Sequence, residues 1–319
     1  MSVDPGKFKF IDLFAGIGGM RIGFETAGGV CVLTSEIDEK AMKTYMLNFD
    51  PAHKHAYFGD IKKIPDNAIP KHDVLIAGFP CQPYSIAGLR KGLKDERGEI
   101  FMEIIRILKS SKPKAFLLEN VKGILAHDSG ATFNYLIEIL EKAGYKTKWD
   151  ILNSMTHANV PQNRERVFIV GFRDEKKLSN FNFPKQIPLT KSISDCLESG
   201  KIDQKYYYDE RFDCYTAISK DVRSKDTIYQ WRRQYVRENK NNVCPTLTAN
   251  MGSGGHNVPL IKTDLGIRKL TPRECGNFQG FPKSFKFPPL ADSSLYHQFG
   301  NSVTVPLISK IAKEFAKVL

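Results

Sequence analysis

Hydrophobic and polar residues follow two different periods along the first half of the chain. Short runs of apolar residues predict buried β-strands over 8–14, 31–36, 73–78, 115–120 and 166–172. Between them, apolar residues recur every three or four positions and predict helices over 39–48, 100–111 and 133–144. Strands that are apolar throughout are buried on both faces. The alternation therefore predicts an α/β fold whose mostly parallel sheet is covered by helices.

The pattern changes after Phe172, and we expect a domain boundary there. Residues 173–262 have no clean periodicity, and the stretch 223–240 carries six Lys or Arg against two acids, interleaved with aromatic residues. Helical spacing returns in 302–319, which we expect to pack on the first domain. We therefore predict one domain from residues 1–172, completed by 291–319, and a smaller domain from residues 173–290.

Composition and charge narrow the class of protein. With 319 residues, 41% of them hydrophobic, the chain is long enough to bury a sizeable core. A net charge of +12 favours a polyanionic partner such as nucleic acid. No apolar run reaches membrane-spanning length and the N-terminus lacks a signal-peptide pattern, so we expect a cytoplasmic protein without membrane contact. Six scattered cysteines without a C-x-x-C pair predict reduced thiols and no metal site.

A glycine-rich turn predicts a nucleotide-like cofactor. In DLFAGIGGMRIGFE (12–25), glycines such as Gly16 and Gly18 follow the first strand, where they let a ligand approach the backbone. Glu36 ends the second strand and would accept hydrogen bonds from a ribose, and Asp60 lies near the next strand end. Arg21 occupies the third position of the dinucleotide G-x-G-x-x-G pattern, which disfavours a nicotinamide dehydrogenase without excluding it. A glycine turn without a ligand is the plainer alternative.

A cysteine and a glutamate follow two of the predicted strands. Cys81 lies between two prolines in GFPCQPYS (78–85), and Glu119 ends the strand over 115–120. Because ligands bind at the carboxyl ends of parallel strands, the thiol and the acid are expected in one cleft. An inert buried thiol, and a glutamate paired with an arginine of 161–167, are the structural alternatives. Together with an adenosyl cofactor, the two groups favour a chemistry in which a thiolate adds to carbon 6 of cytosine and makes carbon 5 nucleophilic.

Eight motifs in order carry a resemblance to a known family. They are FIDLFAGIGG (10–19), SEID (35–38), GDI (59–61), GFPCQPYS (78–85), ENV (119–121), PQNRERVFIVG (161–171), RKLTPRECGNFQGFP (268–282) and QFGNSV (298–303). With them the chain closely resembles the DNA (cytosine-5-)methyltransferases of the bacterial restriction–modification type. The resemblance implies a Rossmann-like S-adenosylmethionine-dependent methyltransferase fold with a smaller target-recognition domain.

The resemblance also implies roles for individual residues. Cys81 would attack carbon 6 of a flipped-out cytosine, Glu119 would engage N3 and the exocyclic amine, Arg166 would hold O2, and Arg164 would brace the catalytic loop. The cofactor S-adenosylmethionine, which leaves as S-adenosylhomocysteine, would contact Phe14, Gly16, Ile17, Gly18, Glu36, Ile37, Asp60, Ile61, Pro80, Asn301 and Val303. Ile37 stands where the family often has a bulky aromatic residue.

Double-stranded DNA is the expected partner. Gln82 and Ser85 belong to a loop expected to close on DNA, and the residues expected to contact DNA in the smaller domain are Arg232, Arg233, Arg237, Thr246, Gly254 and Gly255. We expect a monomer, and a cognate restriction endonuclease that acts on the same site without forming a stable complex. Two alternatives stay open: an RNA enzyme with the same chemistry, which the long insert disfavours, and a binding module without catalysis, which the intact motifs disfavour.

Overall fold

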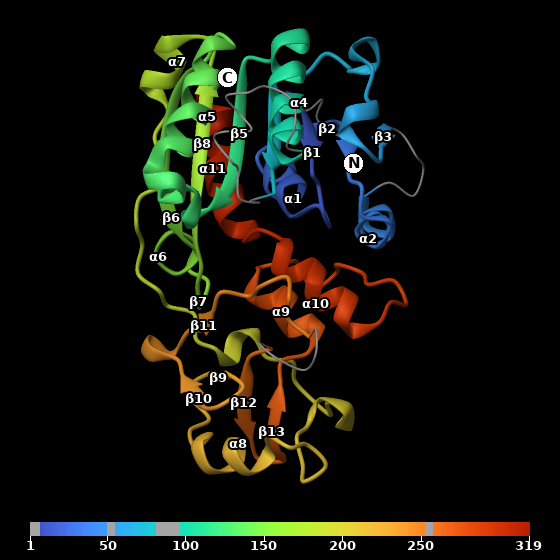
Figure 1. Cartoon of the computed structure of the whole chain (residues 1–319), viewed down its shortest axis with the longest axis vertical. Coiled ribbons are helices and arrows are strands. Elements are labelled where there is room, and N and C mark those ends of the chain that lie inside the picture. The colour runs from blue at the N-terminus through green and yellow to red at the C-terminus, as the bar shows by residue number, and fades with distance from the viewer. Residues whose placement is uncertain (1–6, 50–54, 81–95, 253–257) are drawn as a thin grey trace. The chain divides into compact units, whose positions relative to one another are not determined.

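The computed structural model describes residues 7–49, 55–80, 96–252 and 258–319, and side chains in the third range from residue 100. The chain divides into two compact units (Figure 1). The first unit contains the described residues up to Leu152, together with Glu165–Lys185 and Ile308–Leu319. The second unit contains Asn153–Arg164 and the described part of Gln186–Leu307.

A sheet of seven strands, counted over the described residues, forms the centre of the first unit. Its strands, in spatial order, are β3 (Ala56–Phe58), β2 (Gly29–Ser35), β1 (Phe8–Leu13), β4 (Val74–Gly78), β5 (Ala115–Val121), β8 (Glu165–Phe172) and β6 (Lys146–Asn153). β1 pairs in parallel with both β2 and β4. The chain order reverses between β2 and β4, so the carboxyl ends of β1 and β4 lie at a topological switch point, where open α/β sheets bind ligands.

Helices cover both faces of this sheet, as the continuous apolar strands predict (Figure 1). They are α1 (Gly19–Glu25), α2 (Glu39–Phe49), α4 (Glu96–Ser111), α5 (Ala131–Lys142), α7 (Glu175–Asn180) and α11 (Val305–Val318). Side chains of α4 and α5 form one core with Leu75 and Leu118. On the other face, Phe10 of β1 contacts Phe24 of α1, which in turn contacts Phe315 of α11. The expectation that the C-terminal helix packs on the first domain is confirmed.

Three strands depart from the sequence prediction in direction or extent. β8 runs antiparallel to β5, with Val121 opposite Arg166, because an apolar run does not reveal the direction of a strand. The sequence predicts no range for β6, and of β3 it predicts only an end near Asp60. β3 has only three residues, and β6 lies at the edge of the sheet with mostly exposed or half-buried side chains. Both therefore lack the apolar run from which a buried strand is recognised.

The second unit combines a small antiparallel sheet with short helices. Its elements are α6 (Ser154–Ala158), β7 (Gln162–Asn163), α8 (Tyr215–Asp221), β9 (Tyr229–Trp231), β10 (Val236–Glu238), β11 (Cys244–Pro245), β12 (Leu260–Thr263), β13 (Gly266–Lys269), α9 (Pro272–Phe278) and α10 (Asp292–Asn301). β10, β9, β12 and β13 form a four-stranded sheet in that order. A capping box at Thr271 and Glu274 begins α9, and Glu274 also forms a buried ion pair with Arg268.

The boundaries of the two units differ from the expected domain boundaries. Residues 153–164 and 291–307, expected in the first domain, belong to the second unit, and residues 173–185, expected in the smaller domain, belong to the first. Polar contacts explain part of the difference. Gln162 donates to the carbonyl of Phe278 (2.7 Å), and the hydroxyls of Ser154 and Thr304 lie 2.7 Å apart. Such long-range contacts leave no periodic trace in the sequence.

Among the described residues, no helix combines the length and the apolar character that crossing a bilayer requires.

Candidate active site

The turn after β1 is held in a conformation that favours glycine. Gly16 and Gly18 have φ angles of 56° and 84°, and Phe14, which is not a glycine, has a φ of 55°. A Cβ atom on Gly16 would have no atom within 4 Å, so this glycine faces open space. A Cβ on Gly18 would lie 2.2 Å from the ring of Phe49, so Gly18 is required by packing. Only Gly16 therefore leaves room for a ligand.

Glu36 is fixed against this turn at the end of β2. The backbone N–H of Gly16 donates to one carboxylate oxygen of Glu36 (2.7 Å), and the N–H of Asp38 donates to the other (2.7 Å). The N–H of Glu36 donates to the carbonyl of Phe58, which brings the ends of β2 and β3 together. Burial raises the pKa of Glu36 above its ordinary value, although the two backbone donors act in the opposite direction.

A cavity of about 200 Å³ opens beside Glu36 in the first unit. Five residues predicted for the cofactor line it, namely Phe14, Glu36, Ile37, Asp60 and Ile61. Asp60 caps a short 3₁₀ turn by accepting from the N–H of Lys62 (3.0 Å). The side chain of Ile37 is 70% exposed. The cavity thus joins two carboxylates to apolar surfaces, as an adenosine-like ligand requires.

The other residues predicted for the cofactor do not line this cavity. Ile17 is buried in the core, with 1% of its side chain exposed, and Pro80 is exposed at the end of the described segment 55–80. Asn301 and Val303 belong to the second unit, where the amide of Asn301 lies 3.0 Å from His297. A role for these four residues at the cofactor stays a prediction.

Sequence reasoning missed four residues of the cavity, namely Ser35, Gly59, Lys62 and Ile100. Ile100 is the informative one. The helical period assigns it to the apolar face of α4 with Ile104, which is fully buried in the core. Ile100 lies on the same face one helical turn before Ile104, and there it lines the cavity. Periodicity identifies an apolar helix face but does not show where the core ends and a ligand site begins.

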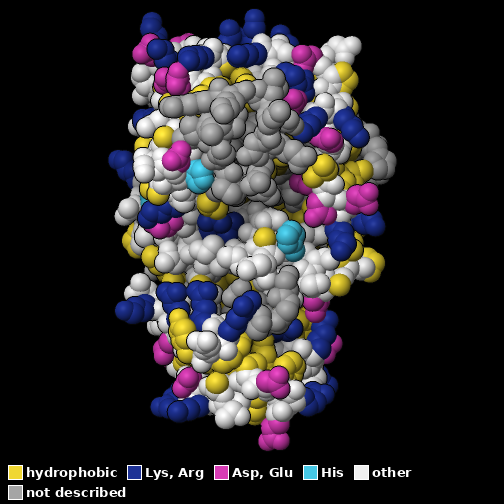
Figure 2. Space-filling model, in the orientation of Figure 1, with side chains coloured by type: hydrophobic (Ala, Val, Ile, Leu, Met, Phe, Trp, Pro, Cys, Tyr) yellow, Lys and Arg dark blue, Asp and Glu magenta, His cyan; other side chains and the backbone are white. Residues whose placement is uncertain are grey.

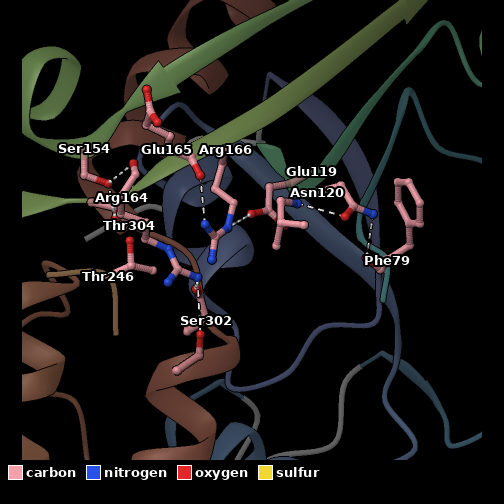
Figure 3. A network of polar contacts seen from close by, with 12 residues as sticks. Phe79, Glu119, Asn120, Ser154, Arg164, Glu165, Arg166, Thr246, Ser302 and Thr304 are labelled. Atoms are coloured by element: carbon pink, nitrogen blue, oxygen red, sulfur yellow. Dashed lines mark hydrogen bonds and ion pairs between the residues drawn. The ribbon is translucent and has the colours of Figure 1, made fainter. Parts of the chain in front are cut away.

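Glu119 is held at the end of β5 by an arginine from the neighbouring strand. Nε of Arg166 lies 3.0 Å from Oε1 of Glu119, and Nη1 of Arg166 donates to the carbonyl of Glu165 (2.8 Å), as Figure 3 shows. Both side chains are largely buried, so the pair is shielded from water. The structural alternative, an ion pair between Glu119 and an arginine of 161–167, is therefore present. It does not exclude a catalytic role, because an oriented carboxyl is also what catalysis needs.

Asn120, the residue after Glu119, links β5 to the end of β4. Gly78 is the partner of Glu119 in the parallel pairing of the two strands. A Cβ atom on Gly78 would lie only 3.5 Å from Oε2 of Glu119. The amide of Asn120 donates to the carbonyl of Phe79 (3.1 Å; Figure 3). The end of β4 is therefore fixed beside Glu119, and Cys81 follows Pro80 in the sequence.

Both terminal nitrogens of Arg164 donate hydrogen bonds within the second unit. Its Nη1 donates to the carbonyl of Leu247 (2.8 Å), and its Nη2 donates to the carbonyls of Gly300 (3.3 Å) and Ser302 (2.5 Å; Figure 3). These hydrogen bonds hold together the backbone at residues 247, 300 and 302. The predicted contact with the catalytic loop lies outside the described residues, as do Cys81, Gln82, Ser85, Gly254 and Gly255 themselves.

Two of the three arginines predicted for DNA line a second cavity. It has a volume of about 560 Å³, lies within the second unit, and includes Arg232, Arg237 and Thr246 but not Arg233. The hydroxyl of Thr246 donates to the carbonyl of Asn163 (2.7 Å). Thr246 therefore also fixes the pairing of β11 with β7.

The five described cysteines are free thiols. Burial raises the pKa of Cys31 and of Cys196 to about 12, and raises those of Cys244 and Cys275 well above the ordinary range. Cys214 is half-buried, and its pKa is also raised by burial. Thiols in such surroundings stay protonated near neutral pH, so none of these five is suited to nucleophilic attack.

Comparison with known proteins finds matches over almost the whole chain. A model of the C-5 cytosine-specific DNA methylases matches residues 8–317. The chain is 50% identical to the Type II methyltransferase M.Bsp6I of Bacillus sp. (strain RFL6), over 97% of this chain and 98% of the relative. It is 43% identical to the Type II methyltransferase M.DsaV of Dactylococcopsis salina, over 98% and 87% of the two chains.

Solved structures show the same fold at low identity. The Dnmt2 methyltransferase of S. pombe superposes with a TM-score of 0.74 at 21% identity, over 98% of each chain. The predicted Rossmann-like methyltransferase fold is confirmed by this likeness and by the seven-stranded sheet. With the family model matching almost the whole length and a relative at 50% identity, the chain belongs to the C-5 cytosine-specific DNA methylase family.

Proposed function

We propose that this protein transfers a methyl group from S-adenosylmethionine to carbon 5 of a flipped-out cytosine within a short specific sequence of double-stranded DNA. One observation carries the proposal: Glu119 is paired in register with Gly78, three residues before Cys81. A carboxyl group at the end of one strand and a cysteine that follows the adjacent strand in sequence supply the two groups that cytosine activation needs. The names of the Type II relatives support a role in protecting DNA from a cognate restriction endonuclease.

The reaction begins with covalent activation of the base. The thiolate of Cys81 adds to carbon 6 while Glu119 engages N3 and the exocyclic amine, so that electron density moves to carbon 5. Arg166, which forms an ion pair with Glu119, would hold the cytosine O2. After methylation, loss of the proton from carbon 5 and elimination of the Cys81 thiolate restore the aromatic ring. Because these atoms are hidden in stacked DNA, the base must leave the duplex first.

The cavity beside Glu36 fits the adenosine part of S-adenosylmethionine. Glu36 would accept hydrogen bonds from the ribose hydroxyls, and Asp60 would accept one from the adenine amino group. Phe14, Ile61 and Ile100 offer apolar surfaces around them. When bound, the cofactor supplies the electrophilic methyl group, and S-adenosylhomocysteine remains as product. Gly16, beside which the turn faces open space, is proposed as a further contact, together with the backbone of Ile17 and Gly18 and with Pro80, Asn301 and Val303.

DNA would contact the second unit and the segment that follows Cys81. Gln82 and Ser85 are proposed to close on the target strand, while Thr246, Gly254 and Gly255 are proposed to lie against the DNA. The net charge of +12 supports a polyanionic substrate. We also propose a cytoplasmic monomer, since one copy of the chain carries all the proposed catalytic residues. A mass near 72 kDa, twice the 36.1 kDa of the chain and independent of concentration, would contradict the monomer.

Base-resolution mapping of 5-methylcytosine tests the function directly. The chain is expressed in a host without cytosine methylation, and the genome is then mapped, with Cys81→Ser as the inactive control. Methylation at one short motif that disappears with Cys81→Ser is the expected result. If the protein binds S-adenosylmethionine but leaves the DNA unmethylated, the DNA substrate is refuted and RNA becomes the substrate to test.

A further inference from the structure

The hairpin formed by β9 and β10 has two chemically different faces. In its antiparallel pairing, Trp231 lies opposite Val236 and Gln230 lies opposite Arg237. Residues directly opposite each other share a face, and successive residues alternate between faces. Trp231 and Val236 therefore mark one face, and Gln230 and Arg237 mark the other.

The apolar face is packed against the small core of the second unit. Tyr229, Trp231 and Val236 contact a cluster that includes Ile218 of α8 and Leu260 of β12. This packing fixes which way the hairpin faces, because a rotation or a one-residue slip would bury the arginines and expose the aromatic rings. The polar face is thereby directed away from the core.

The polar face forms one wall of the cavity of about 560 Å³. Gln230, Arg232 and Arg237 line it, together with Lys240 and several amide side chains. Among the described residues that line this cavity, none carries a carboxylate. Figure 2 shows Lys and Arg side chains gathered over the part of the second unit where Figure 1 draws β10 and β11. The cavity therefore has the charge and the donors that a nucleic-acid surface attracts.

Arg232 is oriented within this wall. Its Nη2 lies 3.3 Å from Oε1 of Gln230, whose side chain is only 5% exposed. Because Gln230 is itself held by the strand pairing, the guanidinium of Arg232 is restrained while its remaining N–H groups stay available. A side chain that is oriented before binding favours hydrogen bonds to one particular base over nonspecific electrostatic attraction to DNA.

Arg233 is placed differently, although it is the next residue. It lies in the hairpin turn with a φ of 64°, is exposed, and is not among the residues lining the cavity. The turn is closed by a hydrogen bond from the N–H of Arg232 to the carbonyl of Tyr235 (2.9 Å). Arg232 and Arg237 therefore line the cavity, whereas Arg233, which has the same charge, lies outside it.

We propose that Arg232 and Arg237 each read a guanine in the major groove of the target DNA, that Arg233 contacts only phosphate, and that Gln230 positions Arg232. This proposal rests on the function proposed above. The major groove admits a two-stranded ribbon, and guanine presents there two acceptors, O6 and N7, that match the arginine fork. A phosphate contact positions the protein but carries no sequence information.

Duplexes carrying 7-deazaguanine test the proposal, because this base lacks the N7 acceptor. Once the target motif is mapped, each of its guanines is replaced in turn, and kcat/KM for methylation is measured. For the unmodified protein, replacement at two positions lowers kcat/KM by about 10-fold each, the scale of one bidentate contact. Arg232→Met and Arg237→Met remove the guanidinium donors, and each variant becomes insensitive to replacement of its own guanine.

Arg233→Ala is the matched control, because it removes a charge one residue away. It keeps the full sensitivity to every 7-deazaguanine, while the slope of log Kd against log salt falls by about 0.9, as for one lost phosphate contact. The Gln230→Leu variant loses sensitivity to 7-deazaguanine at the position read by Arg232 but keeps it at the position read by Arg237. The Gln230→Glu variant keeps a side-chain acceptor for Arg232, so it regains the sensitivity at the first position. Restoration by Gln230→Glu separates positioning from general damage to the hairpin.

Three results would overturn the proposal: no sensitivity of the unmodified protein to any 7-deazaguanine, unchanged sensitivity in both methionine variants, or lost sensitivity in Arg233→Ala. Failure of the proposed function looks different, because the unmodified protein would then methylate no DNA at all. If a methionine variant does not fold, as judged by circular dichroism, Arg232→Ala or Arg237→Ala replaces it in the same assay.

Discussion

Arg166 and Glu119 form the ion pair on which the proposed active site depends. Arg166→Met leaves the largely buried carboxylate of Glu119 without its partner, so we expect the free energy of unfolding to fall by about 3 kcal/mol. Urea denaturation measures the loss. Glu119→Gln in the same chain should recover part of it, because the unpaired charge is then gone. If the losses of the two single variants simply add, the pair does not contribute as proposed.

Lys122 and Glu165 provide the matched comparison for that pair. They are joined at 3.0 Å, but both side chains are about half exposed, so solvent screens their attraction. Lys122→Met should leave the unfolding curve almost unchanged. Both ion pairs join the start of β8 to the end of β5 or the turn that follows it, and they differ chiefly in burial. The contrast between the two variants therefore isolates the effect of excluding water from the pair.

Thiol reactivity distinguishes the proposed nucleophile from the other cysteines. Because burial raises the pKa of Cys31 and Cys196 to about 12, at pH 8 only about one in 10⁴ of either thiol is the reactive thiolate. We expect iodoacetamide to label Cys81 first in the folded protein, with S-adenosylmethionine absent, as followed by peptide mass spectrometry. Labelling of a buried cysteine before Cys81 would contradict the proposed nucleophile, and Cys81→Ser supplies the control.

The packing of α1 against α11 depends on a glycine at one position of α1. A Cβ atom on Gly23 would lie 2.4 Å from a side-chain carbon of Ile308 and 3.0 Å from its backbone carbon. Alanine gains about 1 kcal/mol of helix propensity over glycine, but overpacking against a backbone costs about 1–3 kcal/mol. Gly23→Ala is therefore expected to lower the melting temperature.

Gly59→Ala is the control for that variant, since a Cβ atom there would meet nothing within 4 Å. Equal melting temperatures for the two variants would refute a tight α1–α11 contact. The glycines of the 12–25 motif thus have separate roles. Gly23 serves helix packing and Gly18 accommodates Phe49, whereas Gly16 faces open space. A motif read from sequence does not separate these roles, because each depends on what packs against the glycine.

At the scale of the whole molecule, the charge of +12 predicts salt-dependent binding to any duplex. If about six or more phosphates are contacted, affinity for DNA lacking the target should fall roughly 10³-fold between about 50 and about 200 mM salt. Fluorescence anisotropy measures the slope. A peptide nucleic acid duplex of the same sequence, which has no phosphates, is the control. An affinity for DNA that does not change with salt would contradict an electrostatic interface.

The sequence by itself determined most of the fold and the chemistry. Apolar runs and helical periods are local, so β1, β2, β4 and β5 and the helices between them lie close to where the pattern places them. The motif blocks identified the family, and they also located Glu36, Asp60, Glu119 and Arg166 at strand ends. The carboxyl ends of parallel strands meet at one sheet edge, so Glu36, Asp60 and Glu119 could be predicted to share that edge. Arg166 lies near the start of β8, and only the antiparallel direction of this strand brings it to the same edge.

Only the tertiary structure decided contacts between segments far apart in the chain. The antiparallel direction of β8, the assignment of 153–164 and 291–307 to the second unit, and the extension of the apolar face of α4 to the cofactor cavity all depend on long-range packing. The same holds for the arginines. Arg232 and Arg233 are neighbours of equal charge in the sequence, but hairpin pairing directs one toward the cavity and leaves the other in the turn. A local pattern cannot encode that difference, because it depends on which face of the hairpin the core covers.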